Sequence, residues 1–138
     1  MILLDTNVIV DALDHSQAHD QWAKKQIEDA VSLEAGGISA ITLAELCAGA
    51  RNPTDVESEI KRLGLVVHDI PAAAALACGK AYRRYIVARR NSGGGFSPKT
   101  PLPDFFIGAH AEVMGWKLAT RDQGRFENYF PKVALLTP

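Results

Sequence analysis

The sequence predicts an α/β fold, in which a mostly parallel sheet of about five short strands is covered by helices on both faces. Short apolar runs alternate along the chain with longer stretches whose apolar residues recur at helical spacing, and this order is typical of parallel sheets. The chain has 138 residues, 47% of them hydrophobic, which is enough for one core. We therefore expect residues 1–138 to form a single domain.

Five apolar runs are short enough to be buried strands. The first, Ile2–Leu4, is followed at once by Asp5, Thr6 and Asn7, which are typical of the start of a helix. The strand therefore delivers Asp5 to its carboxyl end. The other expected strands are a short segment near Ile38, residues 65–67, Lys117–Ala119 and residues 133–136.

Between these runs, apolar residues recur every three or four positions, as on the buried face of a helix. The expected helices run from the cap at Asp5 through Leu13 and then cover residues 16–33, 42–50, 53–63, 71–90, 104–114 and 122–129. We expect Gly36 and Gly37 to end the second helix. Residues 91–103 include three consecutive glycines and three prolines, a composition that predicts a flexible loop.

Charge and cysteine usage exclude several classes of protein. The first 50 residues are net −6 and the remainder net +5, so the chain, at −1 in total, does not coat nucleic acid by bulk attraction. Cys47 and Cys78 form no C-x-x-C pair, which argues against a disulfide framework or a thiolate zinc site and favours a cytoplasmic location. The chain opens without a signal-peptide pattern, and no apolar run reaches the roughly 18 residues of a membrane span, so we expect no membrane association.

Four acidic residues are candidates for catalysis and metal binding. Asp5 and Asp122 each follow a short strand, and in doubly wound sheets ligands gather at the carboxyl ends of strands. Glu45 and Asp104 lie in otherwise apolar helical stretches, where an ionised carboxylate needs a partner. The simplest partner is a hard cation, Mg²⁺ or Mn²⁺, and two such ions about 4 Å apart support in-line phosphoryl displacement. The pattern indicates nuclease chemistry.

Helix capping also explains each of these acids. Asp5, Asp104 and Asp122 stand where a helix N-cap is expected, and residues 42–45 fit a capping box in which Glu45 reaches back to the first residue of its helix. Taken singly, a cap is the simpler explanation for each acid. Periodicity alone leaves the choice open.

Four stretches, taken together, resemble the PIN-domain family and, within it, the VapC-type toxins of bacterial and archaeal toxin–antitoxin pairs. They are LLDTNVIV at residues 3–10, SAITLAEL at 39–46, PDFFIGAHA at 103–111 and LATRD at 118–122. The resemblance implies a three-layer α/β/α sandwich whose acids Asp5, Glu45, Asp104 and Asp122 bind Mg²⁺ or Mn²⁺. It also implies cleavage of single-stranded RNA by attack of an activated water on phosphorus, leaving a 5′-phosphate and a 3′-hydroxyl.

The same resemblance implies supporting residues and partners. Thr6, Asn7 and Thr120 match positions where the family keeps small polar residues near the metal, so they are expected to support it, although ordinary capping explains Thr6 equally well. The expected assembly is a homodimer silenced by a cognate antitoxin, which inserts a segment into the active site. The antitoxin binds the operon's DNA, so this chain is expected to meet DNA only through it.

One residue departs from the family pattern. Many relatives carry a further acid where this chain has Arg125, so we expect a second metal site that is weaker or that is completed by the substrate phosphate. Arg121 and Arg125 are candidate contacts to RNA phosphate or to an acidic antitoxin segment. Arg83 and Arg84 belong to a basic run at 80–90 that could guide RNA, although a solvated helix face explains that run more simply.

Three other functions are rivals to this interpretation. A housekeeping RNA-processing or DNA-directed nuclease would use the same acids. A haloacid-dehalogenase-type phosphatase would need a second aspartate at position 7, where this chain has Asn7. A non-catalytic PIN-like regulatory module would keep the fold and tolerate the loss of Asp5 or Asp104.

Overall fold

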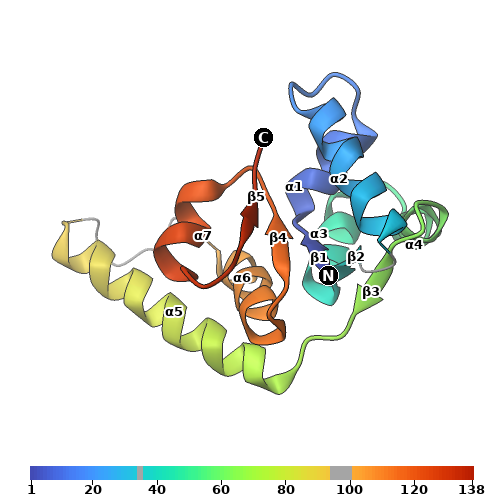
Figure 1. The fold of residues 1–138 in the computed structure, drawn as a ribbon. Helices are drawn as coiled ribbons and strands as arrows, with labels where there is room; N and C mark the ends of the chain where they lie inside the picture. Colours follow the sequence, from blue (N-terminus) through green and yellow to red (C-terminus); the bar gives the residue numbers. More distant parts are fainter. Residues whose placement is uncertain (34–35, 94–100) are drawn as a thin grey trace.

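The computed structural model describes residues 1–33, 36–93 and 101–138. The described elements alternate along the chain much as the sequence predicts (Figure 1). In order they are β1 (Ile2–Leu4), α1 (Thr6–Leu13), α2 (Asp20–Ser32), β2 (Gly36–Ser39), α3 (Ala40–Gly49), α4 (Pro53–Arg62), β3 (Val66–His68), α5 (Ala72–Asn91), α6 (Leu102–Met114), β4 (Lys117–Ala119), α7 (Gln123–Tyr129) and β5 (Leu135–Leu136). Among these elements, no helix is long and apolar enough to cross a membrane.

The five strands form one parallel sheet in the order β3-β2-β1-β4-β5. The chain builds outward from β1 on one side through β2 and β3, then returns to the other side of β1 for β4 and β5. The strand order therefore reverses beside β1, and in parallel sheets the crevice at such a reversal is where ligands bind. Asp5 is the first residue after β1.

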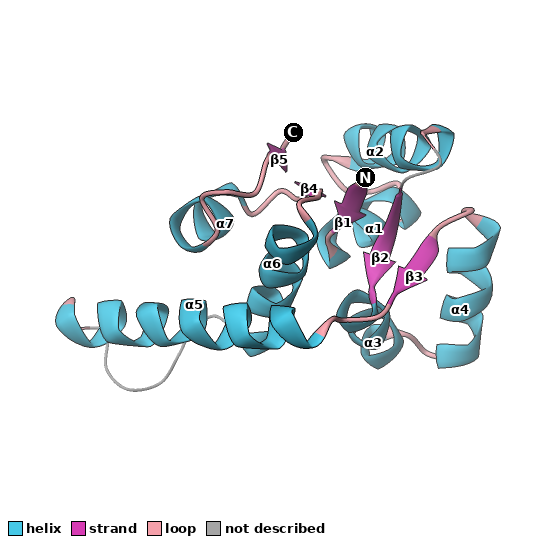
Figure 2. Cartoon of the chain, turned by 60° about the horizontal axis from the view of Figure 1, so that its bottom comes forward, coloured by secondary structure: helices cyan, strands magenta, loops and turns pink. Residues whose placement is uncertain are grey.

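Helices cover both faces of the sheet, which confirms the expected three layers (Figure 2). Side chains of β1 alternate between the faces, as the pleat of a strand requires. Leu3 packs with Phe105 and Phe126 beneath α5, α6 and α7, whereas Leu4 packs with Ile9 and Ile27 beneath α1 and α2. The two cores hold the central strand from both sides, and the position of Asp5 is fixed with it.

The prediction that Gly36 and Gly37 end a helix is wrong, because both residues belong to β2 and pair with Ile2 and Leu3. Glycine is needed there because the strand runs close to its neighbours. A Cβ on Gly36 would lie 2.7 Å from the Cα of Ala30, and a Cβ on Gly37 would lie 2.7 Å from the ring of His68.

Both ends of the segment expected to be a flexible loop, residues 91–103, are helical. Asn91 still belongs to α5 and Leu102 already belongs to α6. Residues 94–100 of that segment lie outside the described residues. The early start of α6 places Asp104 inside its first turn, with Pro101 at the N-cap position.

Candidate metal centre

Asp5 occupies the carboxyl end of the central strand and is only 3% exposed. Its Oδ1 accepts a hydrogen bond from the backbone N–H of Thr6 at 2.7 Å. Its Oδ2 accepts hydrogen bonds from the Thr120 hydroxyl at 2.7 Å and from the Asn7 side-chain amide at 2.8 Å. Asp5 therefore caps α1, as the capping alternative predicts, and is also held in one orientation by donors from two elements.

Burial is the main cause that raises the pKa of Asp5 to about 6 from its ordinary 3.8. The negative charges of Asp104 and Glu45 raise it further, whereas the hydrogen bonds from Thr120 and Thr6 lower it. The structure thus brings Asp5 into the electrostatic field of two other predicted acids. A cation placed nearby would stabilise the ionised form of this carboxylate.

Glu45 lies in the second turn of α3 and is half-buried. It accepts a hydrogen bond from the hydroxyl of Thr6, which lies 39 residues earlier in the chain. The predicted capping box is wrong, because α3 begins at Ala40 and its cap is Ser39, whose hydroxyl accepts the Ile41 N–H at 3.3 Å. The side chain of Glu45 therefore turns toward the end of β1.

Asp104 and Asp122 are joined by Arg125, on α7. One guanidinium nitrogen, Nη1, lies 3.0 Å from Oδ2 of Asp104 and 3.3 Å from Oδ2 of Asp122. The pKa of Asp104 is raised first by burial and then by Glu45 and Asp122, while Arg125 lowers it. Asp122 occupies the N-cap position of α7, as predicted, but its side chain makes no capping hydrogen bond. Asp104 is not a cap, because Pro101 holds that position in α6. The four acids thus form one electrostatically coupled cluster.

Thr120 and Asn7 connect the turn after β4 to the start of α1. The Thr120 hydroxyl, besides donating to Asp5, accepts the backbone N–H of Asp122 at 3.0 Å. The Asn7 side-chain oxygen accepts the backbone N–H of Arg121 at 3.3 Å. These contacts fix the backbone that carries Asp122 relative to Asp5.

Asp11 is a buried acid that the sequence analysis missed. It has no exposed surface, and the guanidinium of Arg121 lies 3.1 Å from its Oδ1. Asp11 follows Asn7 by one helical turn, so both side chains share the face of α1 that meets the turn after β4. An aspartate within the apolar stretch VIVDAL was the signal that could have identified it. In the structure Arg121, expected to contact RNA or an antitoxin, pairs with Asp11.

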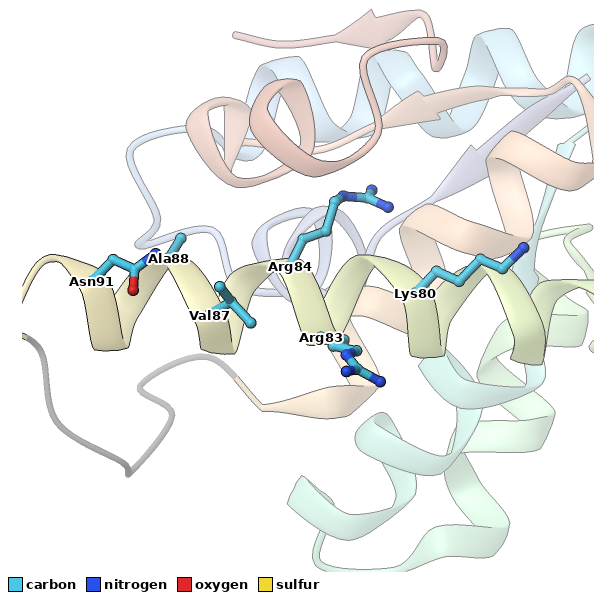
Figure 3. Close-up of a pocket in the computed structure, with 6 residues that line it drawn as sticks. All are labelled: Lys80, Arg83, Arg84, Val87, Ala88 and Asn91. Atoms are coloured by element: carbon cyan, nitrogen blue, oxygen red, sulfur yellow. The ribbon is translucent and has the colours of Figure 1, made fainter.

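Arg83 and Arg84 lie on α5 and point in different directions, together with Lys80 and Asn91 around a shallow hollow (Figure 3). Arg84 points toward α7 and donates to the backbone oxygen of Tyr129 at 3.0 Å. Arg83 points away from α7 and is exposed. The side chains of Arg83 and Arg84 therefore lie on different sides of α5.

The donor chemistry of the acid cluster fits a hard divalent cation. All four residues offer carboxylate oxygens, which Mg²⁺ and Mn²⁺ prefer. A cation would also offset the repulsion that Asp104 and Glu45 exert on buried Asp5. Within the described part of the chain, no three Asp, Glu, His or Cys side chains form a preformed metal cage. The carboxylates are instead engaged by hydroxyl, amide and guanidinium donors, so binding a metal would require some of these contacts to exchange.

The fold and this cluster define a class of protein: a small parallel α/β domain that gathers acids from separate elements at the end of its central strand. The family described as PIN domain matches residues 2–130. The chain belongs to the PIN-domain family, which confirms the resemblance seen in the sequence. PIN-domain toxins of the VapC type are generally nucleases.

Relatives of known name or structure cover almost the whole chain. The plasmid stability protein StbB of Pseudomonas syringae pv. tomato is 38% identical over 136 residues, covering 92% of this chain and 91% of that protein. A DNA-bound VapBC structure from Salmonella typhimurium is 26% identical with a TM-score of 0.70, covering 99% of this chain and 96% of that one. FitAcB from Neisseria gonorrhoeae is 28% identical with a TM-score of 0.65, covering 100% and 98%.

Proposed function

We propose that this protein is a metal-dependent endoribonuclease that cleaves single-stranded RNA, and that it is the toxin of a toxin–antitoxin pair. The observation that carries the proposal is the buried carboxylate of Asp5 at the sheet's reversal point, within the fields of Asp104 and Glu45. When bound, Mg²⁺ or Mn²⁺ makes a water more acidic and neutralises charge on a phosphate. Membership of the PIN-domain family supports the same chemistry.

The chain's own residues have two tasks in this proposal. Asp5, Glu45, Asp104 and Asp122 hold the cation through carboxylate oxygens. Thr6, Asn7 and Thr120 orient those carboxylates, because each donates a hydrogen bond to one of them. Attack of the activated water on phosphorus would leave a 5′-phosphate and a 3′-hydroxyl, and in-line geometry depends on this fixed orientation.

A cognate antitoxin is the protein partner that we propose. An apolar groove between α1, α3 and α4 is lined by Ile9, Leu13, Leu46 and Val56, and Thr6 and Glu45 also line it. A segment of the antitoxin lying in this groove would therefore contact Glu45 of the acid cluster and hinder access to it. The similarity to the DNA-bound VapBC structure and to FitAcB supports this partner. The chain would contact DNA only through the antitoxin.

A second copy of the chain is the other partner that we propose. Leu76 and Val87 lie about three turns apart on one face of α5 and are 63% and 45% exposed. Burying them between two copies would stabilise a homodimer. Light scattering coupled to size-exclusion chromatography measures the mass directly, and a monomer at micromolar concentration would contradict this part of the proposal.

The activity is tested with purified protein and a pool of labelled single-stranded RNA, in Mg²⁺, in Mn²⁺ and in chelator. We expect cleavage in either metal and none in chelator. Asp5→Asn and Asp104→Asn should lower cleavage by orders of magnitude, because each removes a charged ligand. Asp29→Asn is the matched control, since Asp29 pairs with Lys25 on the outside of α2. Equal cleavage in chelator would refute the mechanism.

The toxin role is tested separately in a bacterial host. Expression of the wild-type chain should arrest growth, and expression of Asp5→Asn should not. Normal growth with an active, soluble wild-type enzyme would favour a housekeeping nuclease. Growth arrest that persists in Asp5→Asn would favour a PIN-like module that acts without cutting.

A further inference from the structure

Arg125 places a positive charge inside the acid cluster. Its Nη1 atom contacts carboxylate oxygens of both Asp104 and Asp122, which come from α6 and from the turn after β4. The Arg125 side chain is 26% exposed and that of Asp104 is 18% exposed, so their contact is largely shielded from water. This guanidinium nitrogen therefore occupies the position that a cation bridging the two carboxylates would take.

This contact differs from an ordinary surface ion pair, which contributes little because water and salt screen it. Asp104 lies in the fields of Glu45 and Asp122 as well as that of Arg125, so the guanidinium offsets repulsion among several acids. An arginine remains protonated at every physiological pH, so this charge is permanent. Asp122 is 51% exposed, which leaves its carboxylate accessible from solvent.

We infer that Arg125 is a resident cation that takes the place of a second metal ion between Asp104 and Asp122. The inference rests on the proposed function, because it assumes that the four acids bind a divalent ion. It follows that the wild-type acid cluster holds one divalent ion in addition to the guanidinium. The guanidinium also offers the planar fork of donors that suits a phosphate, so it can contact the RNA backbone from the position of a metal.

The test is a calorimetric titration of the purified protein with Mn²⁺. We expect one ion per chain for the wild type. Arg125→Gln should gain a second ion, or bind Mn²⁺ about tenfold more tightly, because a like charge beside the ion has been removed. Arg125→Lys keeps the charge and should bind one ion. Arg62→Gln is the matched control, since it breaks an arginine–carboxylate pair with Glu59 on α4.

Thermal melting provides a readout that does not depend on activity. Without metal, Arg125→Gln should melt below the wild type, because Asp104 and Asp122 then repel each other with no resident cation. Mn²⁺ should raise its melting temperature more than that of the wild type. Cleavage by Arg125→Gln should be impaired at low Mn²⁺ and recover at high Mn²⁺, as a second ion replaces the guanidinium.

Three results would overturn the inference: two ions on the wild type, the same ion count and affinity in Arg125→Gln, or weaker binding in that variant. The last would mean that Arg125 orders the acids for the metal. Failure of the proposed function gives a different pattern, in which no variant binds Mn²⁺ and cleavage is the same in chelator. If the wild type binds Mn²⁺ and Arg125→Gln binds it with the same ion count and affinity, only this inference is refuted and the proposed function stands.

Discussion

Replacing Asp5 by asparagine should stabilise the metal-free protein at neutral pH while abolishing cleavage. The pKa of Asp5 is about 6 in the fold and 3.8 as its ordinary value. A raised pKa on an acid means that the folded state favours the protonated form. The protonated Asp5 side chain therefore contributes stability that is fully present below pH 3.8 and is lost as the pH rises through 6. Above pH 6 the ionised side chain costs the fold about 3 kcal/mol, which asparagine avoids.

Hydrogen bonding offsets part of this gain. Asparagine has one acceptor oxygen, whereas the Asp5 carboxylate accepts from Thr6, Asn7 and Thr120. An amide nitrogen in the place of Oδ2 would face the Thr120 hydroxyl, which can rotate and accept, and the Asn7 amide, which cannot. The unpaired Asn7 amide costs about 1 to 2 kcal/mol, and this cost does not vary with pH. The net stabilisation at pH 7.5 is therefore about 1 to 2 kcal/mol, and it should fall by about 2 kcal/mol at pH 4.5.

Urea unfolding in chelator, at pH 4.5 and pH 7.5, measures this difference for the wild type and for Asp5→Asn. Asp29→Asn controls for a general change in charge. Adding Mg²⁺ at pH 7.5 should stabilise the wild type and leave Asp5→Asn unchanged, since only the wild type keeps the buried ligand. A free-energy difference between wild type and Asp5→Asn that is the same at both pH values would refute the electrostatic reasoning.

Three further predictions concern the packing around the site. Gly108→Ala should lower the free energy of unfolding by about 1 to 3 kcal/mol, seen in the urea midpoint, because a Cβ there would lie 2.5 Å from a ring carbon of Phe130; an unchanged midpoint would contradict the packing. Arg121→Ala should cost about 2 kcal/mol or more by leaving buried Asp11 unpaired, and adding Asp11→Asn should recover part of the loss in a double-mutant cycle. Burial lowers the pKa of His110 below its ordinary 6.5, so stability should fall as the pH drops below 6.5, and His110→Asn should show a shallower dependence on pH in the same unfolding assay.

Local sequence signals were sufficient for most of the fold. The run before Asp5 and the run Lys117–Ala119 are strands with the predicted bounds, because both are short and their apolar residues are buried. Gly36 and Gly37 were misread because a glycine pair is typical both of a helix end and of a crowded strand. What decides between them is the approach of Ala30 and of His68, and the distant contact to His68 is set by the tertiary fold.

The acids that gather at the candidate site could be selected from the sequence, whereas most of their contacts could not. The reversal of strand order beside β1 explains why Asp5 and Asp122 lie near each other, and this could be expected from their positions after strands. The bond from Thr6 to Glu45 and the pair of Arg121 with Asp11 join residues far apart in the chain. Such partners depend on how helices pack over the sheet, which no local pattern encodes.

The position of β1 in the middle of the sheet also affects when the acid cluster can assemble during synthesis. β1 is made first, but one of its two neighbouring strands, β4, is among the last elements to leave the ribosome. Until then Asp5 lacks the hydroxyl of Thr120, and Asp104 and Asp122 have not joined it. A nascent chain therefore carries only part of the cluster. The complete cluster forms only when translation of this domain is nearly finished.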